Sequence, residues 1–214
     1  MELIRDIISF ILHIDKHLDQ IVATYGSLTY LLLCLIVFLE TGLVVTPFLP
    51  GDSLLFAAGA IASRGLLNPH ILFLILAISA IIGDLVNYMI GTYFGEKILS
   101  SGKFIKKEHL DKTERYFSKY GSKTIVFARF VPIVRTIAPF MAGLGKMEYR
   151  KFGLYNIVGG VVWVFLFIYA GYIFGQTEWV KKNFVSVILM IIIISCIPPF
   201  IEWFKERKKS LIAA

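Results

Sequence analysis

Five charged residues lie within or beside apolar stretches of the chain, where a charged side chain is costly. They are Glu40, Asp52, Asp84, Arg129 and Arg135. A charge at the centre of a bilayer costs roughly 2.5 to 3.5 kcal/mol on insertion scales, so these residues need partners or water. Two guanidinium groups facing a cavity favour a phosphate, because each offers planar paired donors. Acids in so apolar a setting are suited to exchange protons.

Two of these charges, Glu40 and Arg129, occupy matching positions in two similar segments. Residues 36–50 align without a gap with residues 125–139, and both segments begin Ile-Val-Phe. Four of the seven prolines lie in them, where an uninterrupted helix should contain none. The alignment makes Glu40 and Arg129 candidates for a pair where two broken segments meet; a purely structural ion pair is the alternative. The expected break residues are Pro47, Pro50, Gly51, Pro132 and Pro139.

The elements that must position these charges are membrane helices. The 214 residues are 57% hydrophobic and only 17% charged, and the mean hydropathy is +0.74. Such a composition excludes an ordinary soluble domain and predicts an integral membrane protein. Several apolar runs reach the roughly 20 residues that cross a bilayer. They cover about 28–48, 53–62, 71–94, 124–145, 153–175 and 184–201.

Basic residues gather in segments beside these runs, which explains the net charge of +7 by topology and not by nucleic-acid binding. The linker 96–123 and the tail 204–214 are predicted to be cytoplasmic, which gives a multi-pass protein with a cytoplasmic C-terminus. The link 146–151 is basic too, so the fourth run has both ends on one side and cannot span. A re-entrant hairpin, which enters and leaves the membrane on the same side, removes this conflict. Its broken backbone must then be buried in protein or line a watery cavity.

The predicted fold class is an all-α integral membrane protein built as an inverted repeat. Two facing re-entrant hairpins, transmembrane helices and an N-terminal amphipathic helix make up the fold, as in many transporters. Residues 1–27 form the interfacial helix and 28–203 the membrane domain. That domain divides into repeat 1 (about 28–95), repeat 2 (about 124–175) and a final helix (184–203). The side of the N-terminus and the oligomeric state, including a homo-oligomer, stay open.

Structural alternatives exist for the remaining polar residues. Asp52 follows Pro50-Gly51 and suits the N-cap of the second hairpin arm. Arg135 has the length to snorkel towards an interface. Asp84, Asn87 and Tyr88 form a secondary polar site, for which hydrogen bonding between helices is the alternative to a direct role.

Enzyme signatures do not occur in the sequence. It contains no His-Glu-x-x-His, Gly-x-Ser-x-Gly or Walker motif, and its four histidines lie outside the apolar runs. Neither of the two cysteines has metal-ligand spacing. We therefore expect a protein that is not an enzyme and holds no metal or cofactor.

Several motifs together resemble the bacterial DedA family, which is related to the SNARE-associated or VTT-domain proteins of eukaryotes. In sequence order they are Glu40-Thr41-Gly42, Pro47-Phe48-Leu49-Pro50-Gly51-Asp52, Gly83-Asp84-x-x-Asn87-Tyr88, Phe127 to Thr136, Ala138 to Gly143, and the Tyr155 to Gly175 helix with Trp163. The resemblance implies an inner-membrane protein with two facing hairpins, implicated in moving lipids and maintaining the proton gradient. It also implies that Glu40, Asp52, Arg129 and Arg135 are essential.

The leading hypothesis is a lipid flippase of the bacterial inner membrane whose substrate is an anionic lipid carrier such as undecaprenyl phosphate. A phospholipid such as phosphatidylethanolamine is the second choice. Arg129 and Arg135 would hold the phosphate, while Glu40 and Asp52 exchange protons or compete for the arginines. The expected partners are thus membrane lipids and protons, without nucleic acid. The alternatives are a proton-coupled transporter of a small cation or drug, and a non-transport scaffold for envelope biogenesis.

Overall fold

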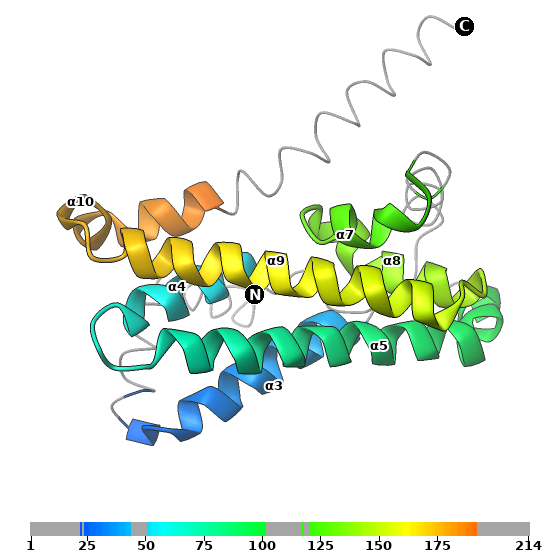
Figure 1. The fold of residues 1–214 in the computed structure, drawn as a ribbon, viewed down its shortest axis with the longest axis horizontal. Coiled ribbons are helices and arrows are strands. Elements are labelled where there is room, and N and C mark those ends of the chain that lie inside the picture. Colours follow the sequence, from blue (N-terminus) through cyan, green and yellow to red (C-terminus); the bar gives the residue numbers. More distant parts are fainter. Residues whose placement is uncertain (1–21, 23, 44–50, 102–116, 118–119, 192–214) are drawn as a thin grey trace, which may run out of the picture.

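The computed structural model describes residues 22, 24–43, 51–101, 117 and 120–191, and every regular element in these ranges is helical (Figure 1). The α-helices are α3 (Leu28–Gly42), α4 (Gly51–Ala62), α5 (Pro69–Ser101), α7 (Thr124–Ala128), α8 (Pro132–Leu144), α9 (Tyr149–Phe174) and α10 (Glu178–Lys182), and a 3₁₀ turn (Gly121–Lys123) precedes α7. Residues 184–191 are also helical. Outside the described residues lie most of the predicted N-terminal helix (1–21 and 23), Pro47 and Pro50, residues 102–116 and 118–119 of the linker, and residues 192–214.

Two long helices, α5 and α9, form the axis of the fold and run side by side (Figure 1). Pro69–Gly95 and Tyr149–Phe174 are long and apolar enough to cross a membrane. They are antiparallel, since Phe73 contacts Tyr169 near one end and Tyr88 stacks on Phe152 towards the other. Apolar residues occur on every face of these two spans, as expected of helices that contact protein on one face and lipid on the other.

Two of the shorter helices each pack on the long helix from the other half of the chain. Helix α4, from the first half of the chain, packs along α9, and α8, from the second half, packs along α5. Small residues allow the close approach. A Cβ on Gly59 would collide with the backbone of Ile168, and one on Gly143 would collide with the backbone of Tyr88.

Matching contacts occur in the two halves of the chain. Phe56 of α4 meets Gly171 of α9, and Phe140 of α8 meets Gly91 of α5. Likewise Ala60 meets Gly175, and Leu144 meets Gly95. Phe56 and Ala60 of α4 thus correspond to Phe140 and Leu144 of α8, which lie 84 positions later. The two halves therefore show equivalent packing at these positions, whereas the inverted repeat and the re-entrant path of each helix pair stay predictions.

The offset of 84 differs from the offset of 89 in the gap-free alignment. Eight residues (43–50) separate α3 from α4, but only three (129–131) separate α7 from α8. The second connection is therefore five residues shorter, which equals the difference between the two offsets. The gap-free alignment fails beyond the break, because the two connections differ in length.

The break of the second helix pair lies directly before Pro132, one of the two prolines predicted to break it. Val131 has extended backbone (φ −124°, ψ 104°), as the residue before a proline prefers, and Pro132 then begins α8. Pro139 lies inside α8 without interrupting it. The prediction of a break at Pro139 is thus wrong. The N–H that proline lacks leaves only the Arg135 carbonyl without its usual helical donor, and packing of α8 along α5 holds the helix together.

Candidate functional site

Arg135 connects the two halves of the protein through two carboxylates. Its Nη2 donates to Glu40 Oε1 at 2.5 Å, and its Nη1 donates to Asp52 Oδ1 at 2.7 Å. Glu40 lies near the end of α3, Asp52 in the first turn of α4, and Arg135 in the first turns of α8. All three side chains are buried. We call these residues the Arg135 cluster.

Arg129 belongs to a second cluster and follows α7 directly. Its Nη2 donates to Asp84 of α5 and, at 2.6 Å, to Asn156 Oδ1 of α9. Asn156 in turn donates to the carbonyl of Ile81 at 3.0 Å, which fixes the orientation of its amide. Arg129 and Asp84 are both almost fully buried. Asp84, Arg129 and Asn156 together are the Arg129 cluster.

The structure does not contain the Glu40–Arg129 pair that the alignment suggested. Glu40 instead lies against the start of α4, where its Oε1 accepts the N–H of Gly51 at 3.2 Å. The side chain of Arg129 lies over the glycine surface of α9, within 3.0 Å of where a Cβ of Gly159 would be. Because Gly51 and Gly159 have no side chain, they leave room for the carboxylate of Glu40 and the guanidinium of Arg129. These two groups contact different partners.

Trp163 joins the two clusters and was missed as a site residue. Its Nε1 donates to Asp52 Oδ1 at 2.8 Å. Its ring centroid lies 4.9 Å from Cζ of Arg135 and 5.9 Å from Cζ of Arg129, within cation–π range of both. Asn156 was missed as well. The available signal was their spacing of seven, which places both side chains on one face of a helix on either side of Gly159 and Gly160.

The three residues of the predicted secondary site have separate surroundings. Asp84 is a member of the Arg129 cluster. Asn87 donates to the carbonyls of Thr41, at 3.1 Å, and Thr136, at 2.8 Å, and so ties α3 and α8 to α5. Tyr88 donates to the Met147 carbonyl at 2.5 Å, within an apolar cluster. Only Asp84 therefore touches the charged network.

The predicted structural alternatives for Asp52 and Arg135 do not describe their surroundings. Asp52 lies inside α4, which begins at Gly51, and its carboxylate contacts Arg135 and Trp163. The Arg135 side chain is only 4% exposed, so it does not snorkel to a surface. Both side chains point into the protein, where the first and second halves of the chain meet.

The network has unused hydrogen-bonding capacity. Among the described residues of the two clusters, two buried acceptors and three buried donors have no partner: Glu40 Oε2, Asp84 Oδ1, Arg129 Nε, Arg129 Nη1 and Arg135 Nε. Each such group costs about 1–3 kcal/mol if it stays unsatisfied. Three acids and two arginines also leave a formal excess of one negative charge. A network in this condition is suited to admit water, a proton or a ligand.

The comparisons with known proteins agree on one family. The VTT domain matches residues 49–173. The chain is 52% identical to Protein DedA of Escherichia coli K12, with all of both chains aligned. It is 38% identical to an uncharacterized membrane protein of Mycobacterium tuberculosis over 83% of this chain and 80% of the relative. It is 31% identical to the inner membrane protein YqjA of E. coli K12, over 71% and 70%. No solved structure matches.

Proposed function

Because this chain belongs to the DedA family of VTT-domain membrane proteins, we propose that it is a flippase of the bacterial inner membrane for a phosphate-bearing lipid. A polyprenyl phosphate such as undecaprenyl phosphate is the first candidate substrate, and a phospholipid such as phosphatidylethanolamine is the second. One observation carries the proposal. A buried guanidinium, Arg135, offers its two outer nitrogens to two acids from the other repeat.

The geometry of Arg135 supports an exchange of ligands. The nitrogens that hold Glu40 and Asp52 are the same two that a phosphate would use for a bidentate contact. A phosphate therefore competes with the carboxylates for one donor fork. Arg129 Nε and Nη1 and Arg135 Nε, without partners among the described residues, would supply further donors. Carboxylates displaced in this way must take up protons or meet water, and this requirement links lipid movement to the proton gradient.

A conformation with both arginines buried corresponds to a closed stage of such a cycle. The side chains of Arg129 and Arg135 are 2% and 4% exposed, so a headgroup cannot reach them from either face. Transporters built from inverted repeats alternate access by moving one repeat against the other around a central site. The Arg135 cluster lies at such a junction, because its acids come from the first repeat and its arginine from the second.

Lipid movement is tested with protein reconstituted in liposomes that contain polyprenyl phosphate. A phosphatase added outside hydrolyses only outer-leaflet lipid, so flipping raises hydrolysis from the outer-leaflet share towards completion. A membrane-impermeant amine reagent labels only outer-leaflet phosphatidylethanolamine, so flipping of this lipid raises the labelled fraction in the same way. We expect wild-type protein to flip the phosphate lipid, and Arg135→Ala to lose this activity. Arg150→Ala, which removes an exposed arginine at the start of α9, should retain it.

The variant is first checked for a single symmetric peak in size-exclusion chromatography. If Arg135→Ala does not fold, Arg135→Lys replaces it, because Lys keeps the charge without the fork. Full activity in a folded Arg135 variant would overturn the assignment of Arg135. The absence of flipping by wild-type protein, with and without a proton gradient, would overturn the lipid proposal.

A second candidate is proton-coupled transport of a small cation. Unpartnered oxygens on Glu40 and Asp84 and the formal excess of one acid favour it. This candidate predicts cation flux, driven by a proton gradient, in liposomes whose lipids stay unflipped. In both candidates we propose transport without catalysis, with membrane lipids and protons as the partners.

A further inference from the structure

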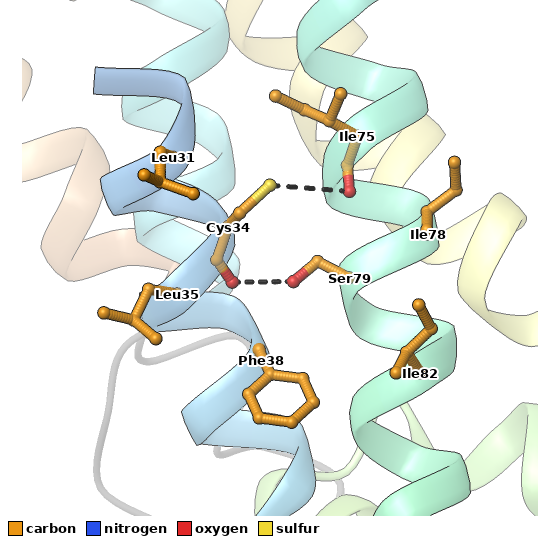
Figure 2. Close-up of a pocket in the computed structure, with 8 residues that line it drawn as sticks. All are labelled: Leu31, Cys34, Leu35, Phe38, Ile75, Ile78, Ser79 and Ile82. Carbon is orange, nitrogen blue, oxygen red and sulfur yellow. Dashed lines mark hydrogen bonds between the residues drawn. The ribbon is translucent and has the colours of Figure 1, made fainter. Parts of the chain in front are cut away.

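An apolar groove lies between α3 and α5 on the outside of the fold (Figure 2). Four residues of α3 line one wall with the spacing of a single helix face: Leu31, Cys34, Leu35 and Phe38. The face of α5 from Ile75 to Ile82 forms the other wall with the same spacing. The groove has a volume of about 380 Å³, within the range of small-molecule pockets.

Two hydrogen bonds close the floor of this groove. Ser79 donates its hydroxyl to the Cys34 carbonyl at 2.6 Å, and the Cys34 thiol lies 3.7 Å from the Ile75 carbonyl (Figure 2). These contacts hold the helices together and use the polar side chains of the lining. The remaining surface is aliphatic or aromatic, so it is complementary to a ligand without polar groups.

The depth of the groove limits what can enter it. Its α5 wall, residues 75–82, lies inside the apolar span Pro69–Gly95 and reaches the middle of that span at Ile82. At that depth a bilayer offers hydrocarbon and no water. Leu35 and Ile78 on the rim are about half exposed, at 53% and 48%. The groove therefore opens into the acyl-chain region of the membrane.

One end of the groove lies beside the charged network. Beyond Phe38 and Ile82 the two helices are in close contact, since a Cβ on Gly42 would lie 3.4 Å from the carbonyl oxygen of Gly83. Glu40 and Asp84 follow Phe38 and Ile82 by two residues each and turn to the inner side of this contact. The groove and the network thus lie close together along the same two helices, two residues apart on each.

We propose that this groove binds one hydrocarbon chain of a membrane lipid. A concave aliphatic surface surrounded by acyl chains takes up an extended chain more readily than a convex helix face does, because more apolar contact forms per chain. In the flippase the occupant would be the tail of the lipid whose headgroup is exchanged at Arg135. This role rests on the proposed function, whereas binding itself does not.

The test uses the full chain in nanodiscs that contain a phospholipid with a photoreactive acyl chain. After illumination, peptide mass spectrometry locates the adducts. We expect adducts on the groove residues of α3 and α5 to exceed those on Leu74 and Leu154 several-fold. These controls are exposed apolar residues of α5 and α9 outside the groove, 57% and 62% exposed. Equal labelling at groove and control positions would overturn the proposal.

A filling substitution provides the matched comparison. Leu35→Trp should reduce groove labelling several-fold by occupying the volume, while Leu74→Trp should leave it unchanged. Two other occupants are examined in a Cys196→Ser background, where Cys34 is the only thiol. A Cys34–Cys34 disulfide formed under mild oxidation would show a second copy in the groove. Cross-links from the groove to residues 1–21 would show the chain's own N-terminal segment there. Either result would overturn the proposal.

The two proposals fail in different ways. Specific groove labelling without lipid flipping would leave the chain site standing and remove its role in transport. Flipping without specific labelling would overturn the groove and leave the proposed function intact. If both stand, Leu35→Trp should slow flipping several-fold relative to Leu74→Trp.

Discussion

The Arg135 and Arg129 clusters are both buried and both lie beside Trp163, yet they hold their guanidinium groups differently. Arg135 gives Nη1 to Asp52 and Nη2 to Glu40. Arg129 makes its hydrogen bonds to Asp84 and Asn156 with Nη2, while Nη1 and Nε have no partner among the described residues. Arg135 thus acts as a fork and Arg129 as a point charge.

The helices joined by each cluster differ as well. The Arg135 cluster joins α8 to α3 and α4, the short helices of the first half of the chain. The Arg129 cluster joins the break before α8 to α5 and α9, the long helices that form the axis. We infer that exchange of partners takes place at Arg135, and that Arg129 holds the break in position and contributes charge.

The largest expected effect comes from removing the charge of Arg129. Arg129→Ala leaves the Asp84 carboxylate buried without a compensating charge, and we expect a loss of about 3–5 kcal/mol of stability. Thermal unfolding in detergent micelles measures this loss. Adding Asp84→Asn should restore much of the stability, because it removes the uncompensated charge. A single variant as stable as the wild type would contradict the structural role assigned to Arg129.

Trp163→Phe tests whether the two clusters act independently, and its expected effect on stability is smaller. It keeps an aromatic ring near both guanidinium groups but removes the Nε1 donor to Asp52. Loss of a hydrogen bond to a charged group should cost about 1.5–3 kcal/mol. A double-mutant cycle should then show coupling of Trp163→Phe to Asp52→Asn and almost none to Asp84→Asn. Equal coupling to both acids would mean that the two clusters behave as one unit.

Lysine substitutions test the difference between fork and point charge directly. Lys has a compact charge without paired donors. Arg129→Lys should therefore retain contact with Asp84 and most of the stability. Arg135→Lys leaves one of its two carboxylates poorly paired, at a cost of about 1–3 kcal/mol, and should reduce lipid flipping at least ten-fold. Greater damage from Arg129→Lys than from Arg135→Lys, in unfolding and in the phosphatase assay, would reverse the assignment.

Sequence reasoning identified the charged residues of both clusters but not their pairing. The cost of a charge among apolar residues selected Glu40, Asp52, Asp84, Arg129 and Arg135, and all five side chains are buried in the structure. The pairing depended on register. A gap-free alignment brought Glu40 opposite Arg129, whereas the connection between α7 and α8 is five residues shorter than that between α3 and α4.

The correct register has a signal in the sequence. Phe56-Ala57-Ala58-Gly59 and Phe140-Met141-Ala142-Gly143 share the pattern Phe-x-Ala-Gly, 84 residues apart. Both glycines contact the backbone of a long helix. Polar partners such as Asn156 and Trp163 were harder to find, because a single amide or indole in an apolar run is common. Only the packing of α9 against both arginines identifies them.

Glycines near the arginines give the last and smallest test, which uses one substitution at two positions of α9. A Cβ at Gly159 would lie 3.0 Å from Cδ of Arg129 and 3.2 Å from the Val126 Cα, so Gly159→Ala must displace the arginine. We expect a loss of about 1 kcal/mol, at the low end of overpacking costs. Thermal unfolding measures this loss. If the losses from Gly159→Ala and Asn156→Ala are not additive in the double variant, the Arg129 cluster is the part affected.

Gly153→Ala is the control, because nothing lies within 4 Å of the Cβ that it would add. Alanine is the better helix former, so this variant should gain up to about 1 kcal/mol. The same substitution in the same helix is thus expected to have opposite signs. A loss at both positions would point to a general need for glycine in α9. A gain at both would mean that Arg129 has room to move, and Arg129 would then no longer differ from Arg135 in its freedom to change partners.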